Sequence, residues 1–205
     1  MWRRYGLGYC EGGCPELDEV DALLGRQRGS SAYLFRRRLI FPLFDHLGRV
    51  IGFAGRILAG DDAKYRNSPE SAIFHKGDRV YGLTDACKDA IQERGRAVVV
   101  EGYTDVMRAQ TAGLAETVCS MGTALTHVQV EVLSRYTKTI VTLFDGDDAG
   151  RQATGKASQV IAETGVRHVP AALPDGLDPD EYIVRYGIAP LVPYLDDLIR
   201  AANGE

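Results

Sequence analysis

An apolar run ends in acid at Val98-Val-Val-Glu101-Gly-Tyr-Thr-Asp105, and the pattern returns at Leu143-Phe-Asp145-Gly-Asp147-Asp-Ala-Gly150. Short apolar runs rich in β-branched residues are typical of strands that are buried on both faces of a parallel sheet. In such a sheet, ligands bind outside the carboxyl ends of the strands. We therefore expect Glu101, Asp145 and Asp147 to meet at one edge of the sheet.

Carboxylates gathered in this way repel one another, and their pKa values rise unless a cation is present. A hard divalent cation removes the repulsion, and Mg²⁺ is commonly held by a few carboxylates together with phosphate oxygens. The sequence therefore predicts a Mg²⁺ site that serves phosphate chemistry. The alternative is that these acids are helix N-caps, because an Asp that follows a strand can accept hydrogen bonds from the first amides of a helix.

The rest of the chain after Tyr81 alternates between helical and strand-like segments. Strands are expected near residues 97–100, 116–119, 139–144 and 167–171, and helices near 84–93, 104–112, 126–136 and 149–163. This alternation predicts an α/β fold in which right-handed crossovers join the strands of a parallel sheet flanked by helices. The segment Leu173-Pro-Asp-Gly-Leu-Asp178-Pro-Asp180 brings further acids to the same edge, and residues 181–205 are expected to form a short helical tail.

The first part of the chain has a different character. Glycines and Pro15 favour loops in residues 1–36, which we expect to be irregular. Residues 37–58 have the pattern of a β-hairpin, with its turn at Asp45-His-Leu-Gly48. The chain thus divides into an irregular segment (1–36), a basic α+β subdomain (37–94), the sheet domain (95–180) and the tail (181–205).

The charge of the chain is unevenly distributed. The net charge is −4, but residues 26–79 contain 11 Lys and Arg against 5 Asp and Glu, whereas the remainder contains 13 against 23. A basic segment beside an acidic one suits a protein that holds a polyanion and acts on it. Arg36-Arg37-Arg38 is expected to guide that polyanion, with a solvated strand edge as the alternative.

Several other classes of protein are excluded. The chain has no run of about 18 apolar residues that could span a membrane, and no apolar stretch follows its charged start, so a cytoplasmic location is expected. Its four cysteines are too few and too scattered for a disulfide scaffold. Cys10 and Cys14 have the C-x3-C spacing of half a zinc site, but no second pair or nearby histidine completes it, so no zinc is expected in this chain.

Six blocks of the sequence, in order, resemble the catalytic (Toprim) core of bacterial DnaG-type primases. They are Phe41-Pro…Gly48-Arg-Val-Ile-Gly-Phe-Ala-Gly-Arg56, Lys64-Tyr-Arg-Asn-Ser-Pro-Glu…Phe74-His-Lys-Gly77, Glu101-Gly-Tyr-Thr-Asp105-Val, Met121-Gly-Thr-Ala-Leu-Thr126, Phe144-Asp-Gly-Asp-Asp-Ala-Gly-Arg151 and Leu173-Pro-Asp-Gly-Leu-Asp-Pro-Asp180. The resemblance covers about residues 37–182. It implies a Toprim-type parallel sheet and divalent-metal-dependent synthesis of short RNA primers on a single-stranded DNA template during replication.

The resemblance also implies roles for individual residues. Glu101, Asp145 and Asp147 would be the central catalytic metal ligands, and Asp105, Asp178 and Asp180 would complete the metal-binding set, which would hold two Mg²⁺ or Mn²⁺ ions. Lys64, Tyr65, Asn67, Ser68, His75 and Lys76 match the basic subdomain, which binds the template and the incoming ribonucleoside triphosphate. The family's zinc-binding module and helicase-docking domain have no counterpart among these residues. Three explanations stay open: an excised fragment, a naturally reduced form, or a chain that works with a separate zinc-binding module. The replicative helicase is a further candidate partner.

Two other functions remain open from the sequence. Another Toprim enzyme, such as a metal-dependent nuclease, could use the same acids to cut phosphodiesters. A non-catalytic module could bind nucleotides or nucleic acid without turnover.

Overall fold

The computed structural model describes residues 8–10, 34–45 and 47–204, which divide into two compact units, Met1–His75 and Lys76–Glu205. The first unit contains an antiparallel sheet in the order β1-β2-β3-β4. Its strands are β1 (Gly8–Cys10), β2 (Arg38–Phe44), β3 (Val50–Ile57) and β4 (Tyr65–Asn67). The expected hairpin is confirmed as β2 and β3, and β1 lies within the segment expected to be irregular. Cys14 lies outside the described residues.

The turn of the hairpin is closed by one side chain. The Asp45 carboxylate accepts hydrogen bonds from the backbone amides of Leu47 and Arg49, both at 2.9 Å, and from the Arg49 side chain. These donors, led by the Arg49 amide, lower the pKa of Asp45 to about 2. Asp45 is therefore occupied in shaping the turn.

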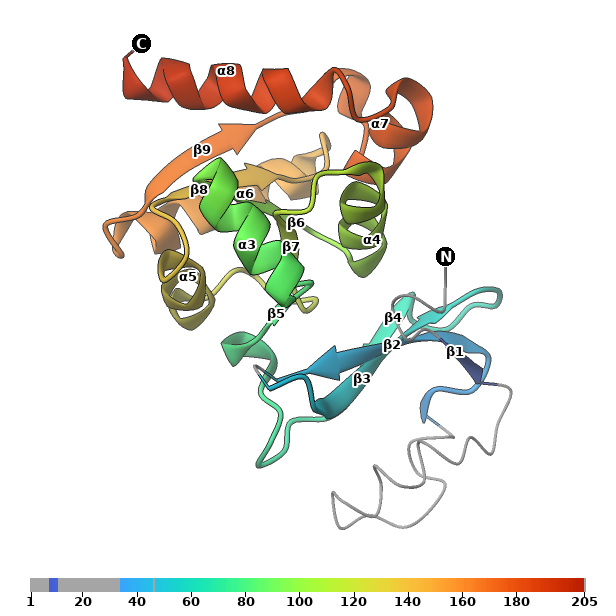
Figure 1. The fold of residues 1–205 in the computed structure, drawn as a ribbon. Coiled ribbons are helices and arrows are strands. Elements are labelled where there is room, and N and C mark those ends of the chain that lie inside the picture. The colour runs from blue at the N-terminus through green and yellow to red at the C-terminus, as the bar shows by residue number, and fades with distance from the viewer. Residues whose placement is uncertain (1–7, 11–33, 46, 205) are drawn as a thin grey trace. The chain divides into compact units, whose positions relative to one another are not determined.

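The second unit is built on a five-stranded sheet in the order β5-β7-β6-β8-β9 (Figure 1). Its elements are η2 (Lys76–Asp78), β5 (Val80–Tyr81), α3 (Asp85–Arg94), β6 (Ala97–Val100), α4 (Tyr103–Ala112), β7 (Thr117–Ser120), α5 (His127–Ser134), β8 (Thr139–Leu143), α6 (Asp148–Ala162), β9 (Arg167–Ala171), η3 (Pro174–Gly176), α7 (Pro179–Tyr186) and α8 (Leu191–Asn203). The strands β7, β6, β8 and β9 are parallel, and β5 is antiparallel at the edge. The predicted α/β fold is confirmed.

The helices of this unit begin and end where local sequence signals predict. Thr84 and Thr126 cap α3 and α5 by accepting hydrogen bonds from the amides three residues later. Gly95 and Gly113 follow α3 and α4 in the left-handed conformation that glycine adopts without strain. The tail forms two helices, α7 and α8.

The two faces of the central strands bury different helices. On one face, Val99 and Ile140 join a cluster with apolar residues of α3, α5 and α6. Helices α4, α7 and α8 cover the other face (Figure 1). Cys87 and Ile91 of α3 belong to the sheet's core, and α3 lies within the second compact unit, which begins at Lys76.

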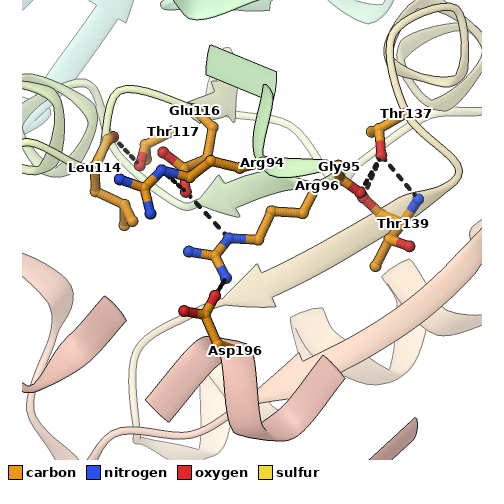
Figure 2. A network of polar contacts seen from close by, with 9 residues as sticks. All are labelled: Arg94, Gly95, Arg96, Leu114, Glu116, Thr117, Thr137, Thr139 and Asp196. Atoms are coloured by element: carbon orange, nitrogen blue, oxygen red, sulfur yellow. Dashed lines mark hydrogen bonds and ion pairs between the residues drawn. The ribbon is translucent and has the colours of Figure 1, made fainter. Parts of the chain in front are cut away.

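A buried charge network lies where β6 and β7 begin (Figure 2). The guanidinium of Arg96, 1% exposed, bonds Glu116, 0% exposed, at 3.1 Å and also pairs with Asp196 of α8. Arg94 lies 3.6 Å from the same Glu116 oxygen. The network therefore ties α8 to the amino-terminal edge of the sheet, opposite the edge where the acids of the site lie.

None of the helices that the structure describes has the length and apolar character that a membrane crossing requires.

Candidate metal centre

The acids of the candidate site meet because β6 and β8 are neighbours. The two strands pair in parallel, with Val98 opposite Val141, so their carboxyl ends reach the same edge of the sheet. Glu101 follows β6, and its Oε1 accepts a hydrogen bond of 3.2 Å from the backbone amide of Asp145, which follows β8. Residues separated by 44 positions thus lie side by side.

Two acids of the predicted set are helix caps. Asp147 caps α6 by accepting a hydrogen bond of 2.8 Å from the Gly150 amide, and Asp178 caps α7 by accepting one of 2.6 Å from the Glu181 amide. The capping alternative from the sequence is therefore correct for the local contact of Asp147, and Asp178 makes a contact of the same kind. A cap of this kind uses one oxygen of a carboxylate that has two, so capping and metal binding are compatible.

Asp105 is the most buried acid of the set, with 8% of its surface exposed. Its Oδ2 accepts a hydrogen bond of 2.9 Å from the Gly102 amide. Burial raises the pKa of Asp105 to about 6, and the carboxylates of Asp178, Asp180 and Glu101 add to the rise. The charges of these three carboxylates therefore act on Asp105.

Asp145 carries the feature that most favours a cation. Its Oδ1 is buried and has no hydrogen-bond partner among the described residues. Burial raises the pKa of Asp145 to about 7, with further contributions from Glu101, Asp105, Asp178 and Asp147. A buried acceptor without a donor is costly, and a cation at this oxygen would satisfy it and relieve the repulsion.

The donor set fits a hard divalent cation in its chemistry. All the candidate ligands are carboxylates, which are the side chains that Mg²⁺ prefers. Within the part of the chain that the structure describes, no three His, Cys, Asp or Glu side chains already lie close enough together to hold a metal ion. The fit therefore depends on the unpartnered Asp145 oxygen and on the mutual repulsion of its neighbours.

Replacing Asp145 with Asn should stabilise the metal-free protein at neutral pH. A carboxyl whose pKa is raised keeps its proton longer in the folded state, so its stabilising contribution is lost as the pH rises from about 4 to about 7. After allowance for solvent screening, we expect D145N to raise the free energy of unfolding by about 1 to 2 kcal/mol near pH 8 and by little near pH 4. Urea unfolding in EDTA measures this difference. The control is Asp89→Asn, at an exposed carboxylate of α3, and a D145N protein no more stable than wild type near pH 8 would contradict the expectation.

Two glycines allow the loop between β8 and α6 to make close backbone contacts. A Cβ atom on Gly150 would lie 2.0 Å from the backbone oxygen of Asp145, and one on Gly146 would lie 2.5 Å from the Cα of Gly176. Side chains cannot be accommodated at such distances without a shift of the backbone. The position of Asp145 therefore depends on the absence of a side chain at Gly150.

Substitution of Gly150 by Ala should displace Asp145 and weaken divalent-metal binding by about tenfold or more, because ligand positions tolerate only small errors. Gly155→Ala, in the same helix, is the matched control, since nothing lies within 4 Å of its Cβ position. Gly155→Ala should leave metal binding unchanged and stabilise α6 by about 0.5 to 1 kcal/mol. Calorimetric titration with Mn²⁺ separates the two variants, and equal metal affinities would show that the loop tolerates the extra methyl group.

The predicted nucleotide-binding residues lie in both units. Lys64 is exposed, and Tyr65 lies in β4, where the guanidinium of Arg56 is 5.6 Å from the centre of its ring. Asn67 also lies in β4, half-buried. Ser68 is buried, and its hydroxyl accepts a hydrogen bond of 2.9 Å from the Phe53 amide.

The remaining two residues of that set come from either side of the unit boundary. His75, in the first unit, is exposed, and its Nδ1 lies 2.9 Å from Oε2 of Glu70. Lys76 begins η2 in the second unit, and its carbonyl accepts a hydrogen bond from Gln129 of α5. Lys64, His75 and Lys76 are thus the lysine and histidine members of the set, and each retains some exposure.

The expectation that all three consecutive arginines face a polyanion is wrong for Arg38. Its side chain is 1% exposed, and its Nη1 donates to the carbonyls of Gly55 and Ala63 at 3.1 and 2.8 Å. Its Nη2 pairs with Asp62 at 2.7 Å. This guanidinium satisfies backbone carbonyls within the first unit, whereas Arg36 and Arg37 are exposed.

Arg108 was not identified from the sequence. Its Nε donates to Oδ1 of Asp180 at 2.5 Å and joins α4 to α7. The available signal was its spacing, because Arg108 follows Asp105 by three positions and residues so spaced share one face of a helix.

The sheet order and the acids after β6 and β8 define a Toprim-like domain, and residues 98–183 match the family model described as Toprim-like. Residues 3–87 match the model described as the DNA primase catalytic core, N-terminal domain. Together, the two matches extend over most of the chain.

Similar proteins agree with both matches. DNA primase of Aquifex aeolicus is 45% identical over 170 residues, which are 82% of this chain and 34% of that protein. DNA primase of Clostridium acetobutylicum is 40% identical over 198 residues, 90% of this chain and 33% of that protein. The chain thus spans about a third of the length of these curated relatives.

Solved structures give the family assignment. The RNA polymerase domain of Mycobacterium tuberculosis primase DnaG superposes with a TM-score of 0.77 at 32% identity, over 99% of this chain and 75% of that one. The zinc-binding and RNA polymerase domains of Aquifex aeolicus primase superpose with a TM-score of 0.79 at 38% identity, over 97% and 51%. The chain belongs to the DnaG-type primase family and corresponds to its catalytic core.

Proposed function

We propose that this chain catalyses the divalent-metal-dependent joining of ribonucleotides into short RNA primers on a single-stranded DNA template. The observation that carries the proposal is the meeting of Glu101 and Asp145 at adjacent strand ends, with one Asp145 oxygen buried and unpartnered among the described residues. A DnaG primase catalytic domain that has been solved bound to single-stranded DNA is 33% identical to this chain.

Glu101, Asp145 and Asp147 would hold Mg²⁺ or Mn²⁺, two ions in our proposal, with Asp105, Asp178 and Asp180 around them. Bound metal supplies Lewis-acid chemistry, which lowers the pKa of the attacking hydroxyl and neutralises charge on the leaving pyrophosphate. Glu101 also orients the loop after β8 through the Asp145 amide. No carboxylate needs to act as a general base in this scheme.

The basic residues would hold the polyanionic substrates. Lys64 and Lys76 would neutralise phosphate charge, and Tyr65, Asn67 and His75 would contact the template or the incoming nucleotide. We assign Ser68 to the loop itself, because its buried hydroxyl fixes the Phe53 amide. Arg36 and Arg37 would attract the template electrostatically, which makes binding sensitive to salt.

The experiment that tests the function is a ribonucleotide polymerisation assay on single-stranded DNA with Mg²⁺ or Mn²⁺. It should be run with and without a supplied zinc-binding module and the replicative helicase, the two partners that we propose for the chain. Template-dependent, metal-dependent RNA synthesis is the expected result. Cutting of the DNA in the absence of ribonucleotides would instead identify a nuclease, and nucleotide binding without turnover in every mixture would identify a binding module.

A further inference from the structure

Arg108 and Asp180 form an ion pair at the candidate metal centre. Their contact of 2.5 Å joins residues 72 positions apart, on α4 and α7. Each of the two residues is close in sequence to a further proposed metal ligand. Asp105 lies in α4 with Arg108, and Asp178 caps α7, which contains Asp180. The pair is therefore built from the two elements that bring the outer acids of the site together.

The charge on Asp180 acts on one other acid of the site, Asp105. It is among the carboxylates that raise the pKa of Asp105. Among the ion pairs formed by described residues, the one with Arg108 is the only pair whose acid belongs to the predicted metal-binding set. Arg108 is thus the residue that already supplies a positive charge to one of the proposed ligands.

The pair is exposed enough to exchange partners. The side chains of Arg108 and Asp180 are 40% and 35% exposed. An ion pair that is open to solvent is worth only about 0.2 to 1 kcal/mol, so a divalent cation can displace the guanidinium at small cost. Arg108 would then be released with its donors available to a phosphate oxygen, the kind of group that a planar guanidinium binds well.

We propose, on the basis of the function proposed above, that Arg108 is a positioning residue that competes with the divalent cation for Asp180. In the metal-free protein its guanidinium holds the Asp180 carboxylate. When metal binds, the cation replaces Arg108 as the counter-ion of that carboxylate. The pair therefore limits the affinity of the empty site for metal and moderates the repulsion among its acids.

The test is a titration with Mn²⁺ by calorimetry of the wild type and of the variants Arg108→Gln, Asp180→Asn and the double variant. Removing the competitor should tighten Mn²⁺ binding by about two- to fivefold in R108Q, because the cation no longer has to break the ion pair to reach Asp180. In the Asp180→Asn background the same Arg108 change should alter affinity by less than about twofold. Arg108→Lys keeps the positive charge, so its Mn²⁺ affinity should be close to that of the wild type.

The controls separate competition from general effects. Arg185→Gln removes one positive charge from α7. The Arg185 guanidinium lies over the Tyr186 ring, and none of its ion pairs among the described residues involves an acid of the set. This variant should bind Mn²⁺ with an affinity within about twofold of the wild type. Thermal unfolding in EDTA should show that every variant is folded, with R108Q slightly less stable because Asp180 is then unpaired.

Each result decides one question. If Glu101→Gln weakens Mn²⁺ binding but R108Q does not tighten it, the competition is overturned. The proposed function would then stay intact. An equal gain in affinity from R108Q with and without Asp180 would overturn it as well. A wild-type protein without saturable Mn²⁺ binding would remove both the competition and the metal-dependent function on which it depends.

Discussion

Replacing Glu101 with Gln is expected to lower template-dependent RNA synthesis by at least about 100-fold, because a neutral amide is a poor ligand for a cation that stabilises charge in the transition state. The substitution preserves the shape of the side chain and an oxygen that can accept the hydrogen bond from the Asp145 amide. The fold should therefore survive. Initial rates of primer synthesis at saturating ribonucleotide and metal measure the effect.

The matched control is Glu93→Gln, at an exposed carboxylate of α3. It should synthesise primers at close to the wild-type rate. Unfolding curves for both variants establish that the loss is chemical. If E101Q retained wild-type synthesis, the assignment of Glu101 as a metal ligand would be wrong.

Removing Arg96 is expected to have the largest effect on stability. Arg96→Met removes the nearest partner of the Glu116 carboxylate, whose side chain is 0% exposed in the wild type, where the next cation, Arg94, lies 3.6 Å away. Breaking a buried pair by deleting one partner typically costs about 3 to 5 kcal/mol, because the remaining charge is left uncompensated. We expect the free energy of unfolding to fall by roughly this amount, as measured by urea denaturation.

The network also provides its own comparisons. Arg94→Met removes the more exposed arginine and should cost less than about 1 kcal/mol. The double variant Arg96→Met with Glu116→Leu removes both buried charges and should recover much of the lost stability, as apolar replacements of buried pairs often do. A loss below about 1 kcal/mol in R96M would mean that Glu116 is already neutral or solvated.

Much of the fold could be predicted because its signals are local. The run at 97–100 has the length and branching of a buried strand, and Thr84, Thr126, Gly95 and Gly113 mark helix ends through short-range hydrogen bonds or backbone conformation. The proximity of Glu101 and Asp145 follows once β6 and β8 are expected to pair in parallel, because the two residues follow the carboxyl ends of these neighbouring strands.

The features that could not be predicted depend on contacts between distant segments. Nothing local distinguishes the buried Arg38 from its exposed neighbours Arg36 and Arg37, because its partners lie 17 and 25 residues away. The edge strand β5 has two residues, too few for a periodic pattern. The pairing of Arg108 with Asp180 likewise requires the packing of α7 on α4.

The helix caps at Asp147 and Asp178 affect how substitutions in this site must be designed. Alanine at either position would fray the first turn of a helix, at a cost of about 1 kcal/mol, while also deleting a carboxylate. A lost activity would then have two causes that cannot be separated. Asparagine caps a helix about as well as aspartate does, so it removes the charge and keeps the turn, and it is the replacement that isolates what these two acids do for a cation.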